Sequence, residues 1–152
     1  MNETLSPTIA ADVAARVYDI RKSDDFGIAF NREFQNHFEI TNKRMDGISG
    51  GIVNQILNRS SGFAFTAQGK SSQFKQHHIF GIRGSKSLAD WLTNGNVATV
   101  CGPRNLEVHS GIQKVFSSLQ DGFNKYLVQH NPKCLHCVGH SLGGAIAELT
   151  AI

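Results

Sequence analysis

The sequence lacks three features that would each indicate a particular class of protein. A membrane-spanning helix needs about 18 consecutive apolar residues, and no segment approaches that length, so only peripheral contact with a lipid interface is left open. The 15 Lys and Arg residues give a formal net charge of only +3 and form no cluster, which argues against nucleic acid as a partner. The N-terminus has no basic stretch followed by an apolar one, so we expect no Sec signal and either a cytoplasmic location or export by a signal-less route.

Cysteine is also scarce, and the odd number of three favours synthesis in a reducing compartment. Cys134 and Cys137 form a CxxC pattern. On a strand these positions point to opposite faces and lie ~10 Å apart, beyond the ~7 Å limit for a disulfide. We interpret them as strand thiols. The alternative is a metal site formed by Cys134, His136, Cys137 and His140, and the same geometry argues against it. No metal and no cofactor are expected.

The residues that are present indicate one globular domain over residues 1–152. The chain is 40% hydrophobic and 18% charged. This composition provides enough apolar side chains for a core and argues against a disordered chain. We find no internal repeat, low-complexity segment or interdomain linker.

Apolar spacing predicts the helices. Ser6 and Pro7 are typical of a helix start, as cap and first helical residue, and the pattern continues to about residue 21. Four phenylalanines at four-residue intervals predict a second helix up to about residue 37. Residues 112–127 have the strongest amphipathic pattern of the chain, and residues 142–152 are again helical in composition. The four phenylalanines are Phe26, Phe30, Phe34 and Phe38.

Short apolar segments bounded by turn residues predict strands at 63–67, 77–83 and 134–138. Gly47, Gly50 and Gly51 indicate a loop before the first of these, and residues 85–92 a turn that enters a short helix. Strands that alternate with helices imply a mainly parallel sheet with helices on both faces, which is a three-layer α/β fold.

The segment Gly-His-Ser-Leu-Gly around Ser141 fits the GxSxG pattern, with a predicted strand before it and a predicted helix after it. The serine of such an elbow has a strained backbone, so neighbouring segments approach closely and a β-carbon at Gly139 or Gly143 would clash. Gly144 is expected to loosen the packing further. The turn places Ser141 at a helix N-terminus, where the N–H of Leu142 and the helix dipole can stabilise an oxyanion. An ordinary glycine-rich turn is the alternative.

Three blocks of the sequence resemble the class 3 (fungal-type) lipases of the α/β-hydrolase superfamily, in that family's order. They are Phe80-Gly81-Ile82-Arg83-Gly84-Ser85 with Asp90-Trp91, then Val108-His109-Ser110-Gly111, then Val138-Gly139-His140-Ser141-Leu142-Gly143-Gly144-Ala145. The resemblance implies that Ser141 is the acyl-accepting nucleophile, that Leu142 lends one oxyanion N–H, and that Ser85 supplies the second donor. It also implies that the substrates are carboxylic esters of acyl lipids. The sequence departs from the family at Ile82 and Ile112, where phenylalanine is more usual.

The sequence does not supply the acid and the histidine of a catalytic triad. In α/β-hydrolases both follow the serine, and after Ser141 come one acid, Glu148, and no histidine. Glu148 lies two turns into the predicted helix and is expected to point away from the active-site mouth. We expect His109 to tie its loop down and His140 to point away from Ser141, so neither is expected to act as the base.

These observations predict the N-terminal part of a lipase-like serine ester hydrolase, incomplete at the C-terminus. The last residues of the chain lack a helix stop signal, and the strand at 134–138 is expected to lie beside a missing neighbour, with an exposed edge. One alternative is a non-catalytic truncated relative that binds acyl lipid or a partner protein, and another is a small metal-binding domain. The sequence leaves the oligomeric state and the head group and acyl length of the substrate open.

Overall fold

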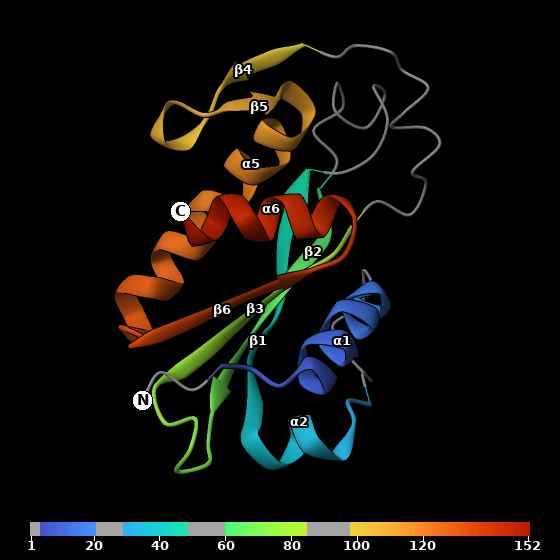
Figure 1. Cartoon of the computed structure of the whole chain (residues 1–152), viewed down its shortest axis with the longest axis vertical. Coiled ribbons are helices and arrows are strands. Elements are labelled where there is room, and N and C mark those ends of the chain that lie inside the picture. Colours follow the sequence, from blue (N-terminus) through green and yellow to red (C-terminus); the bar gives the residue numbers. More distant parts are fainter. Residues whose placement is uncertain (1–3, 21–28, 49–59, 85–97) are drawn as a thin grey trace.

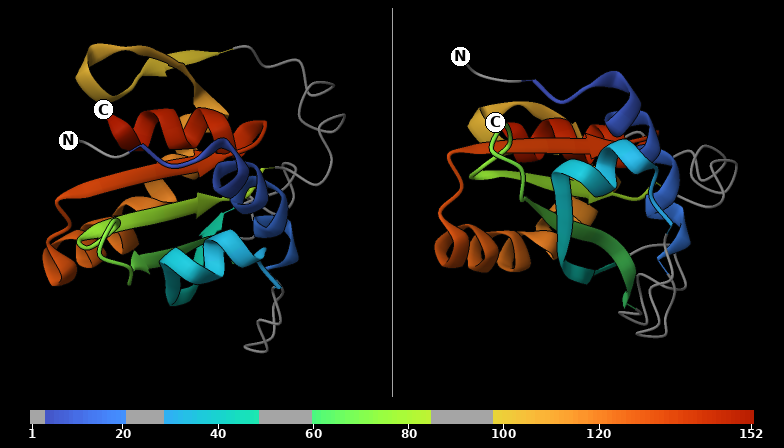
Figure 2. Two further views of the ribbon diagram at one scale, coloured as in Figure 1. Left: turned by 60° about the horizontal axis from the view of Figure 1, so that its bottom comes forward. Right: turned by 90° about the horizontal axis from the view of Figure 1, so that it is seen from below.

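A four-stranded sheet lies at the centre of the computed structural model, which describes residues 4–20, 29–48, 60–84 and 98–152. The strand order is β1 (Phe38–Ile48), β2 (Ser60–Gly69), β3 (His77–Ile82) and β6 (Cys134–Gly139), as Figures 1 and 2 show. Strands β1, β2 and β3 pair antiparallel, and only β3 and β6 pair parallel. The prediction of a mainly parallel sheet is therefore wrong for the described residues. Residues 70–76 between β2 and β3 form a turn, which is too short for the crossover that a parallel pair needs.

Helices pack against both faces of this sheet. α1 (Pro7–Arg16) and α2 (Arg32–His37) belong to one hydrophobic cluster, and α5 (Ser110–His130) and α6 (Leu142–Ala151) belong to another. The side chains of β3 alternate between the two clusters, because successive residues of a strand point to opposite faces. Ile79 joins α1 and α2, whereas Phe80 and Ile82 join α5 and α6.

The first helix begins as the sequence predicts. The Ser6 side chain accepts a hydrogen bond of 3.2 Å from the Ile9 N–H, and Pro7 is the first helical residue. Ile9 and Val13 are fully buried. The helix passes into a 3-10 turn, η1 (Val17–Asp19), so the helical segment ends two residues before the predicted end.

The second helix is much shorter than predicted, since α2 has six residues and Phe38 already begins β1. Phe26 lies outside the described residues. Phe30, Phe34 and Phe38 are nonetheless buried together, with ring centroids 4.0 Å and 5.7 Å apart along the series. Their spacing therefore reflects burial in one cluster rather than one helix face. The sequence did not predict β1, which extends past the expected loop residue Gly47 to Ile48. Gly50 and Gly51 lie outside the described residues.

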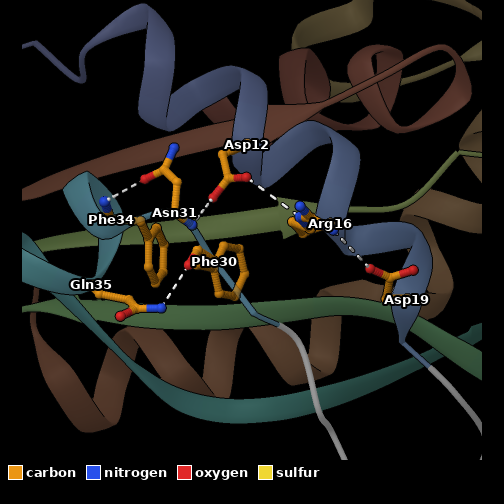
Figure 3. Close-up of polar contacts among 7 residues, drawn as sticks. All are labelled: Asp12, Arg16, Asp19, Phe30, Asn31, Phe34 and Gln35. Carbon is orange, nitrogen blue, oxygen red and sulfur yellow. Dashed lines mark hydrogen bonds and ion pairs between the residues drawn. The ribbon is translucent and has the colours of Figure 1, made fainter.

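Polar contacts join α1 to the start of α2 (Figure 3). Asp12 accepts a hydrogen bond of 2.7 Å from the backbone N–H of Asn31 and lies 3.5 Å from the Arg16 guanidinium. The Asn31 side chain caps α2 by accepting from the Phe34 N–H at 2.8 Å. These bonds satisfy backbone donors at a helix start and hold α1 against α2.

A small second sheet precedes α5. Its strands, β4 (Thr99–Cys101) and β5 (Glu107–His109), pair antiparallel and are joined through a 3-10 turn, η2 (Pro103–Asn105). This hairpin was not predicted. The predicted strands at 63–67, 77–83 and 134–138 correspond to β2, β3 and β6, and the predicted long helix corresponds to α5. None of the helices in the described ranges is long and apolar enough to span a bilayer.

Candidate active site

Ser141 lies in the sharp turn between β6 and α6, where Figure 1 shows the strand passing directly into the helix. Its backbone angles are φ 57° and ψ −126°, a conformation that costs a non-glycine residue energy and that clusters at functional sites. The first turn of the helix holds this conformation, because Gly143 N–H donates to His140 C=O at 3.0 Å and Ala145 N–H donates to Ser141 C=O at 3.2 Å. The Ser141 residue is exposed, and its side chain does not cap the helix.

Two glycines make this turn sterically feasible. A β-carbon at Gly139 would run into the carbonyl group of Gly143, and a β-carbon at Gly143 would lie 2.9 Å from the backbone carbon of Arg83. Backbone atoms cannot move aside as the end of a flexible side chain can. Gly144 differs, because a β-carbon there would have its nearest contact at 3.4 Å, an ordinary van der Waals distance. The clash predicted for Gly139 and Gly143 is therefore present, whereas the packing around Gly144 would accept a methyl group.

The first oxyanion candidate lies where the sequence predicts. Leu142 is the first residue of α6, and its side chain is buried. Backbone N–H groups in the first turn of a helix have no intrahelical acceptor and point toward the positive end of the helix dipole. The second candidate, Ser85, lies outside the described residues, as do Asp90, Trp91 and the short helix predicted at 85–92.

The chain that leads to Ser85 packs directly against the elbow. Gly143 approaches the backbone of residues 82–84 too closely for a β-carbon. Arg83 is buried, and its backbone N–H donates to the Phe63 C=O at 2.7 Å. Its guanidinium lies 5.3 Å from the centre of the Phe63 ring. Burial lowers the pKa of Arg83. The end of β3 and the start of α6 are thus held at one fixed separation.

His140 points toward Tyr18 of η1. The Tyr18 hydroxyl lies 3.2 Å from His140 Nδ1, and the two rings meet edge to face. The same hydroxyl occupies the space that a β-carbon at Gly84 would need. Tyr18 therefore contacts both halves of the candidate site, the elbow and the end of β3. The helical spacing of residues 7–21 gave no signal for this role.

The other candidate base and acid, His109 and Glu148, have contacts elsewhere in the chain. His109 Nδ1 accepts a hydrogen bond of 3.1 Å from the Gly111 N–H and so caps α5. Glu148 is exposed on α6 and lines a cavity of about 290 Å³ between that helix and the β4–β5 hairpin. Within the described ranges, no imidazole or carboxylate hydrogen-bonds to Ser141. The other residues that line the cavity include Leu106, Val108, His109, Ile112, Ala145 and Leu149.

The four residues of the alternative metal site do not come together. Cys137 packs among the residues of α5 and α6, and burial raises the pKa of its thiol to about 11. Cys134 and His136 lie on the opposite face of β6, together with His77. His140 is directed to Tyr18. All three cysteines are free thiols, as expected for Cys134 and Cys137 on a strand.

The sequence of this region is similar to a known family. Residues 79–152, which include the elbow, α5, β3 from Ile79 onward and α6, match the model of the lipase (class 3) family. This part of the chain is similar to the class 3 lipases. A search of curated proteins finds no match to the chain.

Solved structures of lipases have a similar fold. One, described as a triacylglycerol lipase whose catalytic centre is formed by a serine protease triad, has a TM-score of 0.60 and 17% identity, over 95% of this chain and 51% of that one. A triacylglycerol lipase from Penicillium expansum has a TM-score of 0.46 and 17% identity, over 94% of this chain and 53% of that one. The first likeness shows an α/β-hydrolase-like fold. The chain spans about half the length of these two lipases.

Proposed function

We propose that this chain carries the nucleophile of a lipase-type serine hydrolase that cleaves carboxylic esters of acyl lipids through an acyl-enzyme on Ser141. The observation that supports this most directly is the strained backbone conformation of Ser141. This residue is exposed in the turn between a strand and a helix, inside the region that matches the class 3 lipases. Such strain persists only where the surrounding structure fixes it. Here the close approach of Gly139 and Gly143 to neighbouring backbone fixes it.

In the proposed reaction, Ser141 Oγ attacks the ester carbonyl carbon and its proton passes to a histidine base. The carbonyl oxygen becomes an oxyanion, which the Leu142 N–H and the N-terminus of α6 stabilise. Ser85 is proposed as the second donor, because it follows the strand end that packs on Gly143. The alcohol then leaves, and water releases the acyl group from Ser141 in a second step with the same machinery.

The base and its acid are proposed to come from outside residues 1–152. No histidine follows Ser141 in this sequence, and α/β-hydrolases place the acid and then the histidine after the serine. The histidines of the described ranges have other partners, such as Gly111 for His109 and Tyr18 for His140. On this proposal residues 1–152 form the N-terminal portion of a single three-layer domain, and they hydrolyse esters poorly by themselves.

The test is ester hydrolysis by the protein expressed from its full gene, with a soluble nitrophenyl ester and an emulsified acylglycerol as substrates. We expect Ser141→Ala to reduce turnover by a factor on the order of a million. Glu148→Gln is the control, because Glu148 is exposed on the same helix, and it should leave turnover unchanged. Turnover that survives Ser141→Ala would refute the proposal.

The second candidate function is a non-catalytic relative that binds acyl lipid or a partner protein. It is favoured by the cavity of about 290 Å³ beside α6, whose lining includes apolar residues such as Leu106, Ile112 and Leu149 and does not include Ser141. A full gene product that hydrolyses neither ester, yet binds a fluorescent fatty acyl ester, would favour this function over the first.

A further inference from the structure

A second cluster of reactive side chains lies at the opposite end of β6 from Ser141. His77 begins β3, Cys134 begins β6, and these two residues are partners in the parallel pair. His136 lies two residues further along β6 and so points to the same face as Cys134. Figure 1 shows the two strands beginning side by side, whereas the elbow is at the other end of β6.

The three side chains converge on one point. His77 Nδ1 lies 3.0 Å from His136 Nε2, and Cys134 Sγ lies 3.7 Å from the same nitrogen. One ligand atom from each residue lies within 4.8 Å of the other two. All three residues are half-buried, so solvent reaches the cluster.

We propose that His77, Cys134 and His136 bind a divalent transition-metal ion of the zinc type. Zinc prefers thiolate and imidazole ligands in a tetrahedron, at ~2.3 Å and ~2.0 Å, which places two nitrogens ~3.3 Å apart and a nitrogen and a sulfur ~3.6 Å apart. The observed separations of 3.0 Å and 3.7 Å differ from these values by a few tenths of an ångström. Small side-chain rotations therefore suffice, and water completes the tetrahedron.

The surroundings hold the ligands on rigid backbone. The carbonyl of Gln76 accepts hydrogen bonds from the N–H groups of Lys133 at 3.0 Å and Cys134 at 3.4 Å, which fixes the two strand starts together. The Phe74 ring meets the rings of His77 and His136 edge to face.

The bound ion would cross-link the starts of the parallel strands β3 and β6. At their other ends, β6 leads into the elbow and the chain after β3 packs against it. A ligand that binds only the folded chain stabilises it in proportion to the logarithm of its concentration. The proposal does not depend on the chemistry of Ser141. Its rival is a hydrogen bond between the imidazoles of His77 and His136, which needs no ion and no thiolate.

The test is a titration of the reduced 152-residue chain with Co²⁺. The absorption spectrum of bound Co²⁺ shows whether a thiolate is a ligand and whether the site is tetrahedral. We expect a sulfur-to-cobalt charge-transfer band and intense visible bands that saturate at one ion per chain and are displaced by Zn²⁺. Cys134→Ser should abolish the charge-transfer band, and His136→Gln should weaken binding at least about tenfold. Cys101→Ser is the matched control, because Cys101 is an exposed thiol outside the cluster, and both the band and its affinity should be retained.

Circular dichroism of each variant without metal establishes that it is folded. A native chain that gives no charge-transfer band, or a band that persists unchanged in Cys134→Ser, would overturn the proposal. Ser141→Ala should bind Co²⁺ like the unaltered chain, so a failure of the metal site and a failure of the proposed hydrolase are separate results.

Discussion

Single residues set the geometry of the elbow. Ser141 has a backbone conformation that an L-residue rarely adopts, and it is held there because two neighbouring glycines let backbone approach backbone. The pattern of glycines around the serine predicted this close approach at Gly139 and Gly143. The sequence could not predict that Gly144 has room for a side chain, since that depends on how far α6 lies from β6.

The glycines differ in their tolerance of a methyl group. Gly143→Ala puts a β-carbon against the backbone of residues 82–84, so we expect it to lower the free energy of unfolding by about 2 kcal/mol or more, at the upper end of the cost of overpacking. Gly144→Ala has ordinary contacts and gains helix propensity, so we expect a change within about 1 kcal/mol of zero. Urea unfolding of the two variants checks this, and equal losses would contradict the assignment.

The buried hydroxyl of Tyr126 makes stability depend on alkaline pH. Its oxygen lies 2.6 Å from His78 Nδ1 and 3.0 Å from Thr41 Oγ1. Burial raises the pKa of Tyr126, and hydrogen bonds from Thr41 and Thr66 offset this in part. The unfolded chain therefore loses this proton first, so the contribution to stability is complete below pH ~10 and is lost as the pH rises above that value.

Tyr18→Phe leaves Tyr126 as the only tyrosine, since the chain has two. We expect phenolate absorbance in this variant to appear together with the loss of far-ultraviolet circular dichroism as the pH is raised. Phenolate that forms at or below pH ~10 in a chain with native circular dichroism would contradict the raised pKa of Tyr126.

At the scale of elements, local sequence patterns predicted individual helices and strands better than they predicted how the strands pair in the sheet. The Ser6 cap, the amphipathic spacing of residues 112–127 and the strand before the elbow all correspond to elements of the structure. The phenylalanines were misread because burial in a shared core imposes a spacing that one helix face also produces. The strand β1 and the antiparallel pairs depend on contacts between distant residues, which local periodicity does not encode.

The contact between α1 and α2 depends on the cap of α2. Asn31 accepts a hydrogen bond from the Phe34 N–H, and loss of such a cap costs about 1 kcal/mol. We expect Asn31→Ala to lower the unfolding free energy by that amount. Asp19→Asn is the comparison, because Asp19 pairs with Arg16 only at 4.0 Å and both side chains are largely exposed, so its effect should stay within about 0.5 kcal/mol. A larger loss in Asp19→Asn than in Asn31→Ala, measured by chemical denaturation, would contradict this account.

At the scale of the whole molecule, we propose that the candidate site is one half of a catalytic centre. The elbow and the strand end that leads to Ser85 pack directly together, while the described histidines and Glu148 have positions or partners away from Ser141. The sequence pattern placed Ser141 in a strand-to-helix turn, which the structure has, and its role as the nucleophile stays a prediction. The sequence could not predict the contacts of Tyr18 or the meeting of His77 with Cys134 and His136, because each joins segments that are far apart in the chain.

The most direct test is covalent labelling by a fluorescent fluorophosphonate, which reacts with an activated serine. It is applied to the 152-residue chain, to the full gene product and to Ser141→Ala of each, with circular dichroism to show that every sample is folded. The account predicts labelling of the full gene product that disappears in Ser141→Ala, and no labelling of the 152-residue chain that depends on Ser141. Labelling of the 152-residue chain that disappears in Ser141→Ala would show that a working base lies within residues 1–152. Labelling of the full gene product that persists in Ser141→Ala would show that Ser141 is not the nucleophile.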